Sequence, residues 1–376
     1  KVTRNLKVTR KREHSMIIGH GGNIKDLAEK LGCAVEDIID MSSNLNPLGP
    51  PETIEKVICD NLIKIRSLPE PDALTMRKGF ADFHGIDHTQ VVAGNGTTWF
   101  IYTIPQALGS KKVIIAGPTY SDYKDACLMH KIDFQHCIAK ESNQFDLDID
   151  EISKMAKKAD TIFICNPNNP TGSLILREKL EYLIQKHEKT VFIVDESYLP
   201  FVDHANEYSL VSKTGYENLI VLSSMSKIFR IPGLRTGFLS GGKGLCQKIM
   251  AYYQPWSVNS LAQAVIEHIF DYPEKIEPFF RKTRAYIKEE KQIFLENLKG
   301  TKGINFFETS TYFILARLIN GATSKDFCEN LGRHKILIRD CSNFFGLSDK
   351  YIRFSLKERQ INEHLAELIK QAVNND

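Results

Sequence analysis

The stretch VLSSMSKIFRIPGLRTGFL, residues 221–239, carries the side chains whose chemistry is easiest to interpret. A hydrophobic run ends in a serine-rich turn containing Ser224 and Ser226, Lys227 follows at once, and Arg235 comes eight residues later. Serine hydroxyls and a guanidinium suit a phosphate group, and a lysine amine beside them can form a Schiff base. Such an amine must be partly desolvated to be free at neutral pH. A Ser- and Lys-rich loop between two buried strands is the alternative interpretation.

Two further polar residues follow apolar runs. Asp195 ends the run FIVD, and a buried carboxylate costs free energy unless it faces a cation. The protonated nitrogen of a pyridine ring is such a cation, although a helix N-cap would also explain the aspartate. Asn169 lies in ICNPNNPTG, where two prolines and a glycine fix the backbone. Its amide could donate a hydrogen bond to a ring hydroxyl.

These segments, in this order, resemble the fold-type-I pyridoxal-phosphate enzymes, the aspartate aminotransferase superfamily. The matching motifs are NPTG at Asn169–Gly172, D-x-x-Y at Asp195–Tyr198 and S-x-S-K…R at Ser224–Arg235. The resemblance implies an α/β fold, with a large domain built on a mostly parallel sheet and a smaller α/β domain. It also implies pyridoxal 5′-phosphate as cofactor and Lys227, Asp195 and Tyr198 as the catalytic residues.

A glycine turn also fits a phosphate site. Residues 91–98, VVAGNGTT, predict a strand that enters a helix, and a helix N-terminus can aim backbone N–H groups at a phosphate. Glycines in turns after strands more often relieve steric crowding of the backbone than bind a phosphate group. The resemblance places Tyr120 on the cofactor ring. The cofactor-binding residues that it implies are Gly96, Thr97, Tyr120, Asn169, Asp195, Tyr198, Ser224, Ser226, Lys227 and Arg235.

Within the superfamily, HGGN at residues 20–23 and MSSNLNPLG at 41–49 resemble the threonine-phosphate decarboxylase family of cobalamin biosynthesis, whose closest relative is histidinol-phosphate aminotransferase. The resemblance extends from about residue 19 to the C-terminus. Thr97 and the two residues after it depart from relatives that often carry an acid there. The substrate-binding residues implied are His20, Gly21, Asn44, Asn169, Arg339 and Arg353. Arginine forks bind carboxylate or phosphate in a bidentate manner, although strand-end arginines are often surface charges.

The expected function is therefore decarboxylation of an O-phospho-amino acid. L-threonine O-3-phosphate would give (R)-1-aminopropan-2-yl phosphate, and L-serine O-phosphate would give ethanolamine phosphate, for the linker of the cobamide nucleotide loop. A single methyl group changes binding by only about 1–3 kcal/mol, so the sequence leaves these two substrates open. A histidinol-phosphate-type aminotransferase is the alternative. A non-enzymatic regulatory module would need an added DNA-binding domain.

The elements that must position these residues alternate along the chain. Strands are expected at 91–94, 113–116, 134–138, 161–165, 191–195, 219–223 and 236–239, with helical stretches between them. This alternation favours a mostly parallel sheet covered by helices. Helices are also expected at 23–39 and 53–66 and, crossing to the small domain, at 273–299. We expect a basic N-terminal extension (1–18, a flexible arm), a small substrate-binding domain (19–60 with 271–376) and a large cofactor-binding domain (61–270).

Composition is that of an ordinary globular enzyme, with 42% hydrophobic and 25% charged residues. Six basic residues precede the first acid, and without them the net charge of +3 becomes −3. No aromatic residues alternate with them, so we expect no nucleic-acid partner. The eight cysteines are scattered, which favours reduced thiols and a cytoplasmic location. Neither they nor the eleven histidines have metal-ligand spacing, so we expect no metal site. No apolar run predicts a membrane segment. The superfamily resemblance implies a homodimer.

Overall fold

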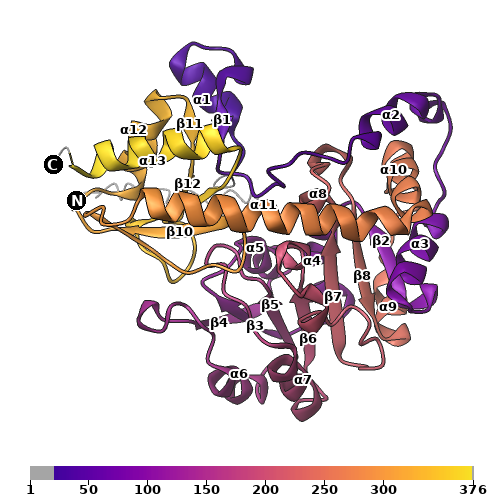
Figure 1. Ribbon diagram of the computed structural model, residues 1–376. Helices are drawn as coiled ribbons and strands as arrows, with labels where there is room; N and C mark the ends of the chain where they lie inside the picture. The colour runs from indigo at the N-terminus through magenta and orange to yellow at the C-terminus, as the bar shows by residue number, and fades with distance from the viewer. Residues whose placement is uncertain (1–20, 375–376) are drawn as a thin grey trace, which may run out of the picture.

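The computed structural model describes residues 21–374, and its largest element is a seven-stranded sheet (Figure 1). Strands β7, β6, β5, β3 and β4 run parallel, whereas β8 lies antiparallel to both β2 and β7. The predicted mostly parallel sheet is therefore confirmed. In spatial order its strands are β2 (Val91–Gly94), β8 (Gly237–Gly241), β7 (Leu219–Ser224), β6 (Val191–Asp195), β5 (Thr161–Cys165), β3 (Lys112–Gly117) and β4 (Asp133–Ile138).

Helices cover this sheet and bury its apolar strands in one large core. Strands β2 and β5 are buried at every position, as expected of strands that have helices on both faces. Phe80 of α3 stacks on Phe238 of β8, with ring centroids 4.2 Å apart. The helices are α3 (Leu74–His84), α4 (Thr97–Ala107), α5 (Asp122–Met129), α6 (Ile149–Ala156), α7 (Arg177–Lys186), α8 (Met225–Ile228), α9 (Lys243–Met250) and α10 (Ser260–Asp271).

A second, smaller core lies under an antiparallel sheet formed by the C-terminal part of the chain. Its strands, in spatial order, are β12 (Arg339–Asp340), β13 (Tyr351–Ser355), β10 (Phe313–Leu318) and β9 (Ile304–Phe306). A separate parallel pair joins β1 (Ile39–Asp40) to β11 (Ile336–Leu337). The helices of this part are α1 (Ile24–Leu31), α12 (Ser324–Arg333) and α13 (Arg359–Asn374). The smaller part therefore takes its elements from both ends of the described chain.

The long helix α11 (Ile276–Asn297) connects the two cores (Figure 1). Its Ile276 and Ile287 belong to the larger core, whereas Phe294 belongs to the smaller one. Helix α2 (Thr53–Asp60) places Ile54 in the larger core. The domain limits expected from the sequence, at residues 61 and 271, stay a prediction.

Two predicted helices are shorter than expected. The helix expected at 23–39 ends at Leu31, because Gly32 adopts a left-handed conformation with φ 65° and its N–H caps the last turn. The helix expected at 53–66 ends at Asp60, and a 3₁₀ turn, Leu62–Arg66, follows it. Within residues 21–374, no helix has the length and apolar character needed to cross a bilayer.

Candidate active site

A cavity of about 220 Å³ lies where the larger sheet meets the smaller part of the molecule. Lys227 and Asn169 come from segments that directly follow parallel strands β7 and β5, and such strand ends meet at one edge of the sheet. The smaller part contributes two arginines. The lining residues are Gly21, Ser42, Ser43, Asn44, Leu45, Tyr120, Ser121, Asn169, Tyr198, Lys227, Pro232, Arg339, Phe344 and Arg353.

Lys227 lies on the single turn α8, which begins where β7 ends. The pKa of its amine is lowered to about 8, mainly by desolvation on burial and also by the positive charges of Arg235 and Arg353, against the opposing effect of Asp195. An amine with this pKa is partly neutral near pH 7 and can act as a nucleophile. The cavity therefore holds a lysine suited to Schiff-base formation.

Asp195 ends strand β6 and is only 5% exposed. Its Oδ1 accepts a hydrogen bond from the Ser197 N–H at 3.0 Å, and its Oδ2 accepts one from the Tyr123 hydroxyl at 2.8 Å. Burial raises the pKa of this carboxyl group, while these donors and Lys227 act in the opposite direction. A carboxylate placed in this way would be stabilised by a cationic ring nitrogen.

Asn169 and Tyr198 are each hydrogen-bonded across the boundary between the two parts. Asn169 Oδ1 accepts a hydrogen bond of 2.5 Å from Arg353 Nη1. The Tyr198 hydroxyl accepts one of 3.3 Å from Asn44 Nδ2, and Asn44 Oδ1 accepts one from Ser355 Oγ at 2.7 Å. These contacts fix the side chains that were expected to meet a ring oxygen and a substrate.

The residues expected to hold the cofactor phosphate, called here the phosphate cup, lie around the N-terminus of α4. They are Gly96, Thr97, Ser224, Ser226 and Arg235. A Cβ atom added at Gly96 would lie 2.7 Å from Arg235 Nη2, and one added at Gly237 would lie 2.8 Å from the Thr97 nitrogen. Ser224 is the cross-strand partner of Gly237, so the two residues share one face of the sheet.

Two more hydroxyl groups stand beside the cup. Ser226 Oγ donates to the Thr236 carbonyl at 3.2 Å. Thr236 Oγ1 is buried without a hydrogen-bond partner in the described part of the chain. Backbone N–H groups at the helix start, a guanidinium and hydroxyls form a donor set that fits a phosphate ester.

The two arginines expected to bind substrate lie directly opposite each other, because Arg339 of β12 is paired with Arg353 of β13. They are only 9% and 4% exposed. Arg339 donates to the Asp340 carbonyl and to Asn343 Oδ1, and Arg353 donates to the Ser42 carbonyl. Burial lowers the pKa of Arg339. Like charges opposite each other destabilise a sheet, so an anion bound between them would relieve the repulsion.

Most of the predicted site residues line the cavity, and the others are not part of its lining. Gly21 lines the cavity and lies so close to Ser42 that a Cβ atom would be 2.6 Å from its carbonyl oxygen. Asp195 lies behind the lining, bonded to its own neighbours. The phosphate-cup residues form a separate group on α4, β7 and β8. His20 and the basic N-terminal extension lie outside the described residues.

Sequence reasoning missed several residues that support the site. Tyr123 and Ser197 hold Asp195, while Asn343 and Phe344 contact Arg339, whose guanidinium carbon lies 5.1 Å from the Phe344 ring centroid. Asn343 and Phe344 stand in the same LIRDCSNF segment as Arg339, so their spacing could have suggested them. Tyr123 offers no such signal, because its partner lies 72 residues further along the chain.

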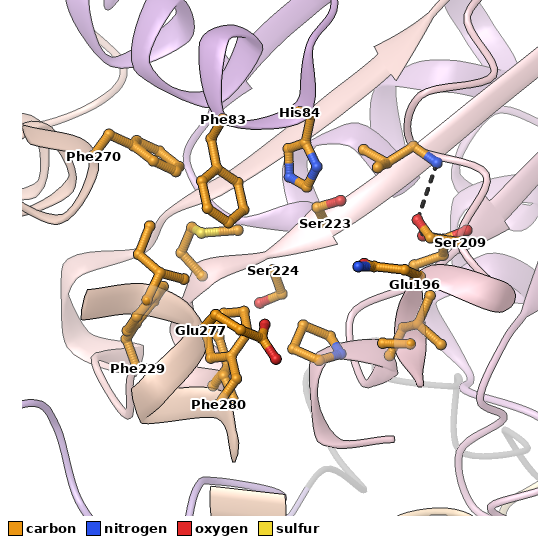
Figure 2. A pocket seen from close by; sticks show the side chains of 18 of the residues that line it. Phe83, His84, Glu196, Ser209, Ser223, Ser224, Phe229, Phe270, Glu277 and Phe280 are labelled. Carbon is orange, nitrogen blue, oxygen red and sulfur yellow. Dashed lines mark hydrogen bonds between the residues drawn. The ribbon is translucent and has the colours of Figure 1, made fainter. Parts of the chain in front are cut away.

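A second cavity, of about 450 Å³, is larger but has different chemistry (Figure 2). Phenylalanine rings form much of its wall, together with Ser223 and Ser224. Burial lowers the pKa of His84 to about 4 and raises the pKa of Glu196 to about 7. The Glu196 carboxylate accepts hydrogen bonds from the Leu210 N–H and from Ser209 Oγ. Because neither Lys227 nor the two arginines line it, we assign the chemistry to the smaller cavity.

Comparison with known proteins gives concordant results. The family described as aminotransferase class I and II matches residues 36–369. The bifunctional adenosylcobalamin biosynthesis protein CobDQ of Leptospira interrogans is 33% identical over 92% of the chain, which spans only 40% of that relative. A histidinol-phosphate aminotransferase from Methanocaldococcus jannaschii is 29% identical, over 94% of both chains. The crystal structure of L-threonine-O-3-phosphate decarboxylase from Porphyromonas gingivalis superposes with a TM-score of 0.80 at 29% identity, over 89% of this chain and 99% of the other.

Proposed function

Because the chain belongs to the aminotransferase class I and II family, we propose that it is a decarboxylase of O-phospho-amino acids. The family uses pyridoxal 5′-phosphate, as the sequence predicted, and the donor set around Lys227, Asp195 and α4 fits this cofactor. When bound, the cofactor supplies an electron sink for the bond that breaks at the substrate Cα.

The residues of the chain then have distinct roles. Lys227 would hold the cofactor and would return a proton to Cα. Asp195 would keep the ring nitrogen protonated, and Asn169 and Tyr198 would bond the ring oxygen. Tyr120 would contact the ring. Gly96, Thr97, Ser224, Ser226 and Arg235 would hold the phosphate group.

The observation that supports the substrate class most strongly is the paired arginines. Arg339 and Arg353 are buried, directly opposite and oriented toward a cavity that also contains Lys227. An amino acid carrying both a carboxylate and a phosphate offers one anion to each guanidinium. Asn44 and Asn169, with Gly21 and His20, complete the substrate site that we propose.

We propose phosphothreonine or phosphoserine as the substrate, giving (R)-1-aminopropan-2-yl phosphate or ethanolamine phosphate for the cobamide nucleotide-loop linker. The similarity to CobDQ and to the P. gingivalis decarboxylase supports this choice. Decarboxylation would require the site to hold the substrate so that the bond from Cα to its carboxylate breaks rather than the bond to hydrogen.

A histidinol-phosphate aminotransferase is the second candidate, favoured by the 29% identity to the M. jannaschii enzyme. The same lysine, aspartate and arginines would serve it. The two reactions would differ in which bond of the substrate Cα breaks, and this depends on the bound substrate.

We further propose a cytoplasmic homodimer. Arg235 is exposed to solvent in the single chain. The attraction between an arginine and a phosphate group is stronger when both are shielded from water, and a second subunit would provide that shielding. The nearby segment 62–68 exposes four large apolar side chains, which is unusual for a surface that stays in contact with water. They are Leu62 (49% exposed), Ile63 (60%), Ile65 (66%) and Leu68 (73%). All eight cysteines are free thiols, which suits a reducing compartment.

The decisive experiment gives phosphothreonine, and separately phosphoserine, to the holoenzyme without any keto acid. A decarboxylase restores the aldehyde form of its cofactor in every cycle, so we expect continuous carbon dioxide release with an unchanged cofactor spectrum. A single stoichiometric conversion to the amino form of the cofactor, followed by turnover with histidinol phosphate and 2-oxoglutarate, would assign the protein to the aminotransferases instead.

A further inference from the structure

Tyr123 makes a contact whose role goes beyond packing. It lies on the first turn of α5, just after β3, and its side chain is 1% exposed. Its hydroxyl donates to Asp195 Oδ2 at 2.8 Å, while the other carboxylate oxygen, Oδ1, accepts from the Ser197 N–H at 3.0 Å. Both oxygens of the buried carboxylate therefore already have a donor from the protein.

The surroundings of Tyr123 hold this phenol in place. Its ring stacks on Phe163 of β5, with centroids 5.0 Å apart and planes inclined by 21°. The Cys165 thiol also contacts the hydroxyl. Burial raises the pKa of Tyr123 well above its usual value, so the phenol keeps its proton and remains a donor at every working pH. The protonated hydroxyl can therefore donate to Asp195 over the whole of this pH range.

A carboxylate that accepts two hydrogen bonds is a weaker base than one that accepts a single hydrogen bond. Asp195 and the cofactor ring nitrogen share one proton, and the weaker base leaves more of it on the nitrogen. Loss of the Tyr123 hydrogen bond would make Asp195 more basic and would draw the proton toward the carboxyl group. The protonated ring is the better electron sink.

We propose that Tyr123 is a positioning residue that keeps Asp195 ionised and directed, so that the proton stays on the pyridine nitrogen of the cofactor. This inference rests on the proposed function only in requiring pyridoxal phosphate at Lys227. It holds equally for a decarboxylase and for an aminotransferase, because both need the protonated ring.

The test uses Tyr123→Phe, which removes one oxygen atom and keeps the ring. The matched control is Tyr312→Phe, since Tyr312 is also completely buried and its hydroxyl has no partner in the described part of the chain. Each holoenzyme is loaded with cofactor labelled with ¹⁵N in the ring, and the nitrogen chemical shift is followed from pH 6 to 9. This measurement needs neither substrate nor turnover.

We expect a protonated nitrogen throughout this range in the wild type and in Tyr312→Phe. In Tyr123→Phe the shift should move toward that of the neutral ring, and kcat should fall about 10- to 100-fold with little change in KM, as expected for the loss of one hydrogen bond to a charged group. Tyr123→His, which retains an N–H donor, should recover part of the protonated signal.

A Tyr123→Phe spectrum identical to that of the wild type at every pH would overturn the proposal and leave Tyr123 as a packing residue. If the phenylalanine variant fails to fold, Tyr123→Leu, which also lacks the hydroxyl donor, takes its place, and a spectrum identical to that of the wild type at every pH would equally refute the proposal. Failure of the proposed function is distinguishable, because a wild type that shows the protonated signal but releases no carbon dioxide would count against decarboxylation alone.

Discussion

Lys227 should destabilise the cofactor-free protein, and the cost can be worked out from its pKa. The pKa falls from 10.5 to about 8 on folding, mainly through desolvation. A shift of about 2.5 units corresponds to roughly 3.4 kcal/mol. Because the side chain is partly exposed, solvent screening reduces this to about 2–3 kcal/mol. We therefore expect Lys227→Met apoprotein to be more stable than wild type by about 2–3 kcal/mol at pH 7.

The sign follows from proton binding. Between pH 8 and pH 10.5 the unfolded chain binds a proton at Lys227 that the folded chain has released, so wild-type stability rises with pH in this window. The advantage of the methionine variant should therefore be complete below pH 8 and should disappear as the pH approaches 10.5. For a chain of 376 residues, 2–3 kcal/mol corresponds to a Tm increase of about 3 °C.

The assay is urea unfolding of the apoproteins at pH 7 and pH 10. Lys357→Met is the matched control, because burial also lowers the pKa of Lys357 to about 8 and this residue does not line the cavity. Both variants should gain stability at pH 7, but only Lys227→Met should lose cofactor that borohydride can trap. A Lys227→Met protein equal to or less stable than wild type at pH 7 would show that the ammonium group is well solvated, and the reasoning would be wrong.

Three further outcomes are expected. Arg339→Ala and Arg353→Ala should each raise KM by tens- to a thousand-fold while leaving the cofactor absorbance unchanged, and loss of cofactor from either variant would instead place that arginine at the phosphate group. Asp195→Ala should bind cofactor weakly and lose most turnover, so undiminished kcat would remove the aspartate from its role. Glu196→Gln should stabilise the protein by about 3 kcal/mol at pH 8 and not below pH 4.5, because the folded pKa is raised from 4.5 to about 7 and wild-type stability falls as pH rises through that window. Equal denaturation midpoints at pH 8 would contradict this.

The relative positions of the candidate residues could be predicted where chain order and spatial order coincide. Strands β5, β6 and β7 are consecutive in the chain and adjacent in the sheet, so Asn169, Asp195 and Lys227, which each end or follow an apolar run, come to one edge of the sheet. The contacts that the sequence did not reveal depend on packing between distant segments. Tyr123 reaches Asp195 from a helix that follows another strand, and no periodicity encodes that distance.

The local sequence pattern also predicted a helix that is longer than the observed one. The pattern at 23–39 continues past Gly32, but the observed helix ends there because glycine adopts the left-handed cap more easily than any other residue. A strand follows in its place because residues 39–40 find a partner at 336–337, far along the chain. A pairing between segments so remote leaves no trace in the local sequence pattern.

That pairing has a consequence for the order in which the molecule can be assembled on the ribosome. The seven-stranded sheet uses only residues 91–241, so it can form while the C-terminal third is still being synthesised. Strand β1 is made first among the strands, yet it must wait for β11, and Arg353 emerges later still. Lys227 and the residues at the start of α4 can therefore be in place before Arg339 and Arg353 complete the cavity, so under the proposed function a nascent chain would form its cofactor site before its substrate site.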